Sequence, residues 1–161
     1  MTEAELLTFL QSQKVAVQAS VSADGAPEAA IVGIVVTDSF EIFFDCTTVS
    51  RKVANLRANP KIALVIGGTI AGDERTVQLD GIADEPTGKE LSRLKKAYFK
   101  TYPDGKGREK WPDIAYMRVK PTWVRYSDYN QIPPVIVEFD PNTMGGAPIP
   151  TDESRANENP R

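Results

Sequence analysis

Two adjacent cations, Arg51 and Lys52, follow Ser50 at the predicted start of a short helix. The serine hydroxyl can accept a hydrogen bond from a first-turn N–H group, which suits the N-cap position. Cations are unfavourable in a first turn, where the helix dipole is already positive, unless an anion lies among them. The N–H groups, the hydroxyl and the two cations together fit a phosphate group. This segment is equally consistent with cations that point into water or pair with acids such as Asp45.

The flanking residues predict how this segment is held. The preceding strand ends in the polar run 45–48, whose backbone groups could lie beside a flat ligand. Taken by itself, that run is better explained as an ordinary strand end. Val49, Val53 and Leu56 would form one apolar stripe on the helix, which ends at the Asn-Pro pair that follows.

Three further positions carry groups that could do chemistry. Thr76 and Gln78 project from one face of a predicted strand, where they could hydrogen-bond the polar edge of a ring. A strand face exposed to solvent explains the same alternation equally well. Cys46 could be a redox thiol, but it has no neighbouring cysteine and no histidine to lower its pKa. A buried small residue is therefore the favoured interpretation of Cys46.

The bulk composition is that of one ordinary globular domain, with 161 residues, 41% hydrophobic and 25% charged. A net charge of −3 gives no support for broad binding to nucleic acid or to a membrane surface. Glu3 and Glu5 precede any hydrophobic run, which is wrong for a secretory or transit peptide. With one cysteine, an internal disulfide is excluded, and a cytoplasmic location is expected.

The chain contains no histidine. This removes histidine-based catalytic triads and most catalytic zinc sites, so no metal site is predicted. An enzyme built on this chain would most simply take its chemistry from a cofactor.

Hydrophobic periodicity predicts a β-rich chain with three helices. Besides the segment after Ser50, the helices cover 3–12 and 87–102, and Thr2 and Thr87 each begin a capping-box pattern. The predicted strands cover residues 14–21, 27–37, 41–46, 61–67, 75–83, 114–126 and 134–139. The sixth strand is expected to bend or bulge at Pro121.

The first strand alternates regularly. Val15, Val17, Ala19 and Val21 share one face, which predicts a half-buried strand with this apolar face inward.

Short antiparallel strands with hairpin turns and a few helices predict a mainly β, α+β domain over residues 1–140, built as a small barrel with helices at its ends. An open α+β sheet is the alternative. Residues 141–161 are rich in Pro, Gly, Asn and charge and predict a flexible tail.

The run 42–64 resembles the signature of the pyridoxamine 5′-phosphate oxidase-like, FMN-binding split β-barrel family. In both, a strand ends in a small polar residue and is followed by a Ser-Arg-Lys helix start, a Leu, Asn-Pro and another strand. The resemblance extends, more weakly, over roughly residues 6–130. It implies an antiparallel split β-barrel of six to seven strands.

The resemblance also implies a cofactor site. Arg51 and Lys52 would hold the FMN phosphate with help from Ser50, the flavin-contacting strand end falls on Cys46, and the backbone of 31–34 would follow the isoalloxazine ring. The implied cofactor-binding residues are Ser50, Arg51, Lys52, Asp45, Cys46, Ile31, Val32, Gly33, Thr76 and Gln78.

The departures from the oxidase limit what the resemblance implies about activity. Ala30 and Val35 stand where the oxidase carries basic residues, and its C-terminal substrate segment has no counterpart, so pyridoxamine-phosphate oxidation is not expected. The chain resembles a smaller member: a homodimer with FMN at the interface and an unidentified small-molecule substrate. No catalytic residue is assigned; Tyr98 and Asp45 are candidates for proton transfer.

Several alternatives remain open at the level of sequence. The chain could be a flavin-binding or stress-response module without turnover. The same fold could bind the deazaflavin F420 or haem in place of FMN. A structural dimer with an empty groove is a further reading.

Overall fold

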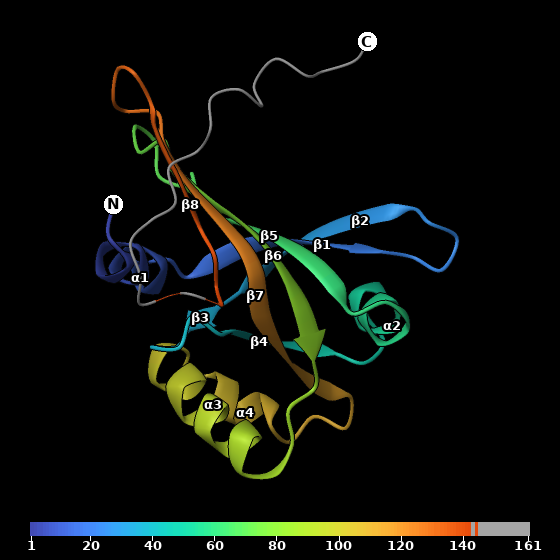
Figure 1. Cartoon of the computed structure of the whole chain (residues 1–161). Helices are drawn as coiled ribbons and strands as arrows, with labels where there is room; N and C mark the ends of the chain where they lie inside the picture. The colour runs from blue at the N-terminus through green and yellow to red at the C-terminus, as the bar shows by residue number, and fades with distance from the viewer. Residues whose placement is uncertain (143, 145–161) are drawn as a thin grey trace.

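The computed structural model describes residues 1–142 and 144, and their strands form one antiparallel sheet (Figure 1). Seven of its eight strands are ordered β2-β1-β5-β6-β7-β4-β3, and the eighth, β8, pairs with β7. The strands are β1 (Val15–Val21), β2 (Pro27–Gly33), β3 (Val35–Val36), β4 (Ile42–Thr47), β5 (Lys61–Gly67), β6 (Arg75–Asp84), β7 (Ile114–Asp128) and β8 (Val135–Phe139). The helices are α1 (Glu3–Ser12), α2 (Arg51–Ala58), α3 (Gly88–Thr101) and α4 (Gly105–Arg108).

The sheet closes because its two ends are neighbours in the chain. The strand predicted over 27–37 is in fact two strands, β2 and β3, interrupted at Ile34. There the Ile34 N–H donates to the Lys14 carbonyl at 2.8 Å; β2 pairs with β1, whereas β3 pairs with β4. A sheet whose opposite ends are joined through one residue must curl, which produces the predicted split barrel.

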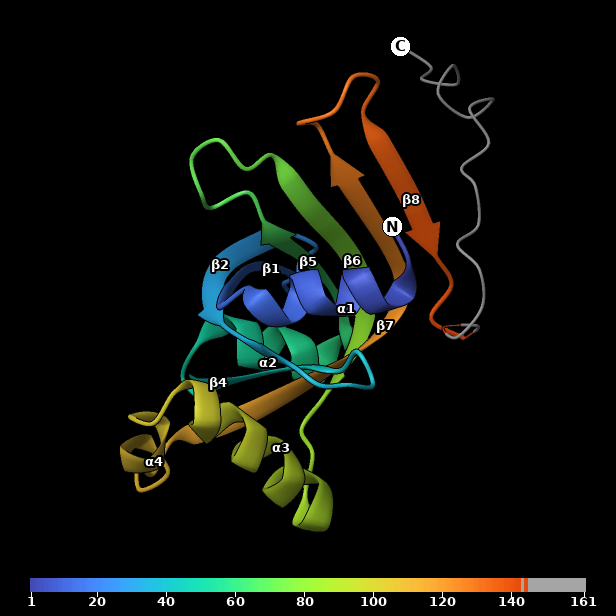
Figure 2. The ribbon, with the colours of Figure 1, turned by 90° about the vertical axis from the view of Figure 1, so that its left-hand side faces the viewer.

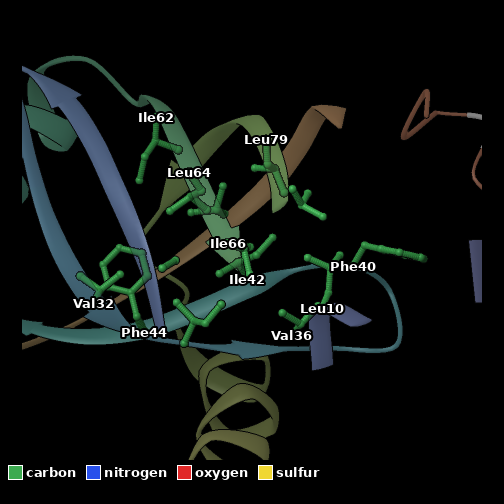
Figure 3. Packing of buried hydrophobic residues seen from close by; sticks show 14 of the residues in the cluster. Leu10, Val32, Val36, Phe40, Ile42, Phe44, Ile62, Leu64, Ile66 and Leu79 are labelled. Carbon is green, nitrogen blue, oxygen red and sulfur yellow. The ribbon is translucent and has the colours of Figure 1, made fainter. Parts of the chain in front are cut away.

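The interior of the curled sheet is filled by inward side chains from the strands, together with α1 and α2. Figure 3 shows Val32, Phe44, Leu64 and Leu79 converging there from four different strands. On α2, Val53 and Leu56 are buried in the same cluster, as predicted, but Val49 precedes the helix and is 81% exposed, so its place in the stripe was wrong.

The helices α3 and α4 cover the outer side of β4 and β7. Figure 2 shows them below α1 and α2, on the other side of β4. Phe43 stacks on Tyr116 with ring centroids 5.7 Å apart, and Leu94 and Tyr98 of α3 complete this second apolar cluster. The two faces of β4 therefore face two different groups of helices.

The predicted irregularity near Pro121 is confirmed as a bulge between β6 and β7. Asp80 pairs with Trp123 and Gly81 with Pro121, so Thr122 is the extra residue. A Cβ atom on Gly81 would lie 2.6 Å from Val119 Cγ1 and 2.8 Å from the Lys120 carbonyl oxygen, so glycine permits the close backbone approach.

The two predicted capping boxes have different outcomes. At α1 the box is confirmed, with hydrogen bonds in both directions between Thr2 and Glu5. At α3, Thr87 is the N-cap residue but makes no side-chain capping bond, so that prediction was wrong.

No helix among the described residues is long and apolar enough to cross a membrane. Most of the tail predicted over 141–161 lies outside the described residues.

Arg118 of β7 ties α3 to the sheet. Its side chain is 10% exposed and binds Asp84 through two nitrogens, Glu41 at 3.2 Å and Glu90 of α3 at 3.2 Å. Arg93 of α3 shares Glu41 and Glu90 with it. This network joins β6, β7, α3 and the residue just before β4.

Replacing Arg118 by Met removes the central cation of this network. Asp84 would lose its cation, and Glu41 and Glu90 would keep only Arg93, so we expect a loss of roughly 2 kcal/mol in the free energy of unfolding. Urea denaturation measures it. Arg93→Met is the matched control, since Arg93 is 45% exposed and binds two of the same carboxylates, so its cost should be below about 1 kcal/mol. Equal losses for the two variants would contradict a special role for Arg118.

Candidate cofactor site

The first turn of α2 has no side-chain cap. Ser50 occupies the N-cap position, but its hydroxyl donates to the Thr47 carbonyl oxygen at 2.7 Å and does not accept from the helix. The predicted cap bond was therefore wrong, and the hydroxyl instead bonds to the carbonyl at the end of β4. The Val53 N–H already donates to the Ser50 carbonyl at 3.1 Å, so the N–H groups of Arg51 and Lys52 are the ones left for another acceptor.

The two cations of this turn differ in their surroundings. Arg51 is 82% exposed and its Nη1 lies 2.7 Å from Oε1 of Glu28 on β2. The pairing with an acid is therefore present, but with Glu28 and not with Asp45. Lys52 is half-buried and makes no ion pair or hydrogen bond with any residue that the structure describes. A free lysine beside uncapped N–H groups is suited to an anion.

A buried polar group lies behind this turn. Asn55 of α2 donates to Oε2 of Glu28 at 2.9 Å and to the Ser20 hydroxyl at 3.2 Å. Ser20 and Gln18 are almost fully buried on the inner face of β1, and Gln18 Oε1 has no hydrogen-bond partner within the described chain. The alternation of β1 predicted the period correctly but the wrong inward face, because Val17 and Val21 are exposed and the polar residues are buried.

Asp45 and Cys46 point to opposite sides of β4. Asp45 accepts hydrogen bonds from the Tyr98 hydroxyl at 2.8 Å and from Arg108 Nε at 2.7 Å, on the α3 and α4 side. Cys46 packs against the main core. The two side chains implied as flavin contacts therefore point away from each other. Sequence reasoning missed Arg108, which lies on the short helix α4 in a region predicted only to end α3.

Burial governs the acidity of the candidate titratable groups. It raises the pKa of Cys46 to about 11, and the nearby Lys52 ammonium only partly opposes this shift. The thiol therefore stays protonated at neutral pH, as expected for a structural cysteine. Burial, and then the hydrogen bond to Asp45, raise the pKa of Tyr98 well above its usual value. The Tyr98 phenol is therefore a poor proton donor near neutral pH.

The segment predicted to follow the flavin ring has three different environments. Ile31 is 73% exposed on the outer face of β2, whereas Val32 is buried in the core. Gly33 lies against the ring of Tyr102, whose nearest atoms would be 3.3 Å from a Cβ at this position. The Tyr102 hydroxyl also donates to the Lys14 carbonyl, which fixes this ring beside the end of β2.

Gln78 lies on the outer face of the sheet, and Thr76 lies on the same side of β6. Gln78 pairs with Val65, which pairs with Val17, which pairs with Ile31. Thr76 is half-buried and Gln78 exposed.

The structure thus brings some predicted residues together and separates others. Ser50, Arg51 and Lys52 share one turn, and Cys46 lies near it. Asp45 instead bonds to Tyr98 of α3 and Arg108 of α4. Ile31 and Gln78 lie on the outer face of the sheet. One copy of the chain does not enclose a ligand with all of these side chains.

Comparison with known proteins identifies the family. The family model described as pyridoxamine 5′-phosphate oxidase matches residues 2–128. No curated protein matches the chain.

Solved structures share the fold at low identity. A haem-binding protein from Mycobacterium smegmatis has a TM-score of 0.76 and 19% identity, over 88% of this chain and 59% of that chain. General Stress Protein 26 from Bacillus anthracis has a TM-score of 0.63 and 19% identity, over 85% and 98%. A pyridoxamine 5′-phosphate oxidase-related, FMN-binding protein from Nostoc punctiforme has a TM-score of 0.64 and 12% identity, over 85% and 88%.

Two of these relatives are named for different ligands, haem and FMN, so the likeness concerns the fold and leaves the ligand open. The chain spans about three fifths of the length of the Mycobacterium protein. The family model, in contrast, covers most of the chain, including the α2 signature and the strands around it. The chain belongs to the pyridoxamine 5′-phosphate oxidase family and has its split β-barrel fold.

Proposed function

We propose that this chain binds FMN at the first turn of α2 and is an oxidoreductase acting on a small molecule. The observation that carries the proposal is the uncapped start of α2, where Lys52 has no ionic partner in the described chain and Arg51 lies beside it. Backbone N–H groups and two cations suit the phosphate of FMN. An FMN-binding protein with the same fold supports this assignment.

The chain's own contribution would be to hold and orient the cofactor. Bound FMN would supply the electron or hydride transfer. Lys52 and Arg51 would neutralise its phosphate, and the bond from Ser50 to Thr47 keeps the turn before α2 in place. The backbone at the end of β2 would border the ring, on the side that Tyr102 leaves free.

Haem is the alternative suggested by the Mycobacterium relative. Haem iron needs an axial ligand, and the commonest one, histidine, is absent from this chain. The thiol of Cys46 is a poor substitute, because burial raises its pKa to about 11. These two observations favour FMN over haem. The deazaflavin F420 would also place an anionic group against these cations, and its absorption spectrum distinguishes it from FMN.

We propose that two copies of the chain complete the site. The outer face of β2, β1, β5 and β6 exposes Ile31, Val17, Val65 and Ile82, each by 41% or more. A groove of about 410 Å³ lies on this face. Such a contiguous apolar face is uncommon on a monomer. A second copy seated on it would cover the apolar residues and bring outer-face residues such as Gln78 toward a cofactor.

We expect Arg51→Ala with Lys52→Ala to weaken FMN binding about 20-fold, because two charge-assisted contacts to the phosphate are lost. Flavin fluorescence titration of the apoprotein measures the Kd. Arg57→Ala with Lys61→Ala removes the same charge, from the last turn of α2 and from the start of β5, and should leave the Kd within about twofold. Parental affinity in the first double variant would show that the phosphate binds elsewhere.

We expect Val65→Asp to convert a dimer to a monomer, because a carboxylate would be buried at the centre of the apolar face. Light scattering after size-exclusion chromatography measures the mass. Val49→Asp is the control, since Val49 is 81% exposed before α2 and its change should leave the dimer intact. A wild-type chain that is monomeric at micromolar concentration would contradict the proposed interface.

We expect the FMN-loaded protein to lose its blue flavin absorbance when NADH or NADPH is added without oxygen. Free FMN with the same donors is the control for uncatalysed reduction, and dithionite establishes that the bound flavin can be reduced. Protein that binds FMN but is reduced no faster than free FMN by either donor would favour the non-catalytic binding module.

A further inference from the structure

Glu28 places a carboxylate inside the proposed phosphate site. Its Oε1 lies 2.7 Å from Arg51 Nη1, and its side chain is only 18% exposed. Its other oxygen accepts from Asn55, which is itself buried and donates also to Ser20. The carboxylate is therefore held from behind by α2 and β1, whereas Arg51 reaches it from solvent.

The two partners of this ion pair differ in how easily they can move. Arg51 is 82% exposed and binds only Glu28 among the described residues, so its long side chain can turn away at little cost. Glu28 would have to break a bond to a buried amide, and Asn55 would lose one of its two acceptors and keep only Ser20. When an anion approaches, Arg51 is the partner that changes position.

We infer that Glu28 is an internal competitor for the phosphate group, which occupies Arg51 in the free chain and makes Lys52 the principal phosphate ligand. The inference rests on the proposed function and concerns the same site. Lys52 has no competing acid in the described chain, whereas Arg51 must exchange a carboxylate for a phosphate. The fixed negative charge of Glu28 also repels a dianion, so the site discriminates less strongly between FMN and riboflavin than its two cations alone would predict.

The opposite reading is that Glu28 orients Arg51 toward the phosphate. A supporting carboxylate would increase the affinity for FMN, whereas a competitor lowers it. The two readings therefore predict changes of opposite sign when the charge of Glu28 is removed.

Glu28→Gln tests this directly in the full-length apoprotein. The amide keeps the size of the side chain and an oxygen for Asn55, but it releases Arg51. We expect the Kd for FMN to fall about tenfold and the Kd for riboflavin, which lacks the phosphate, to stay within about twofold. Glu85→Gln is the matched control: it releases Arg57 at the other end of α2 with the same change in charge, and should leave both Kd values unchanged.

A second comparison does not depend on the folding of the Glu28 variant. In the otherwise native chain, Arg51→Ala should raise the Kd for FMN only about twofold, whereas Lys52→Ala should raise it about tenfold. Equal effects of these two changes, or an unchanged or weaker FMN affinity in Glu28→Gln, would overturn the inference. If the parent and the variants bind neither FMN nor riboflavin, the proposed function fails as well, which is a distinguishable result.

Discussion

The joining of β2 to β3 through Ile34 is the constraint on which the rest of the molecule depends. These strands lie at opposite ends of the sheet order, yet they are consecutive in the chain. Closure follows, and it gives the sheet an inner and an outer face. The inner face takes up α1 and α2, and the far side of β4 takes up α3 and α4 (Figure 2). The position of α2, and with it the candidate phosphate site, is therefore a result of topology.

Within this frame, β1 serves two purposes at once. Its inward residues Gln18 and Ser20 are polar, and Ser20 supports Asn55 and through it Glu28. Its outward residues Val17 and Val21 are apolar and exposed. The usual distribution of polarity across a half-buried strand is thus reversed. The inward side places polar groups behind the start of α2. The outward side gives an apolar face suited to a second copy of the chain.

Local sequence signals predicted much of this fold. The Ser-Arg-Lys segment located the start of α2, and alternation located seven strand segments, because both signals depend on neighbouring residues. Alternation in β1 gives the period but not which side faces inward, so that assignment was wrong. The partners of Arg51 and Asp45, namely Glu28 and Arg108, lie far away in the chain and became visible only when the strands were placed. A resemblance in one segment carries no information on such pairs.

The ion pairs at the two ends of α2 connect this helix to separate parts of the sheet. Arg51 binds Glu28 on β2, and Arg57 binds Glu85 just beyond β6, while Val53 and Leu56 between them are buried. Dissolved salt screens exposed charges but leaves apolar burial largely intact. High ionic strength would therefore loosen both ends of the helix before its middle. A marine or halophilic setting would leave α2 anchored mainly by its two buried apolar side chains.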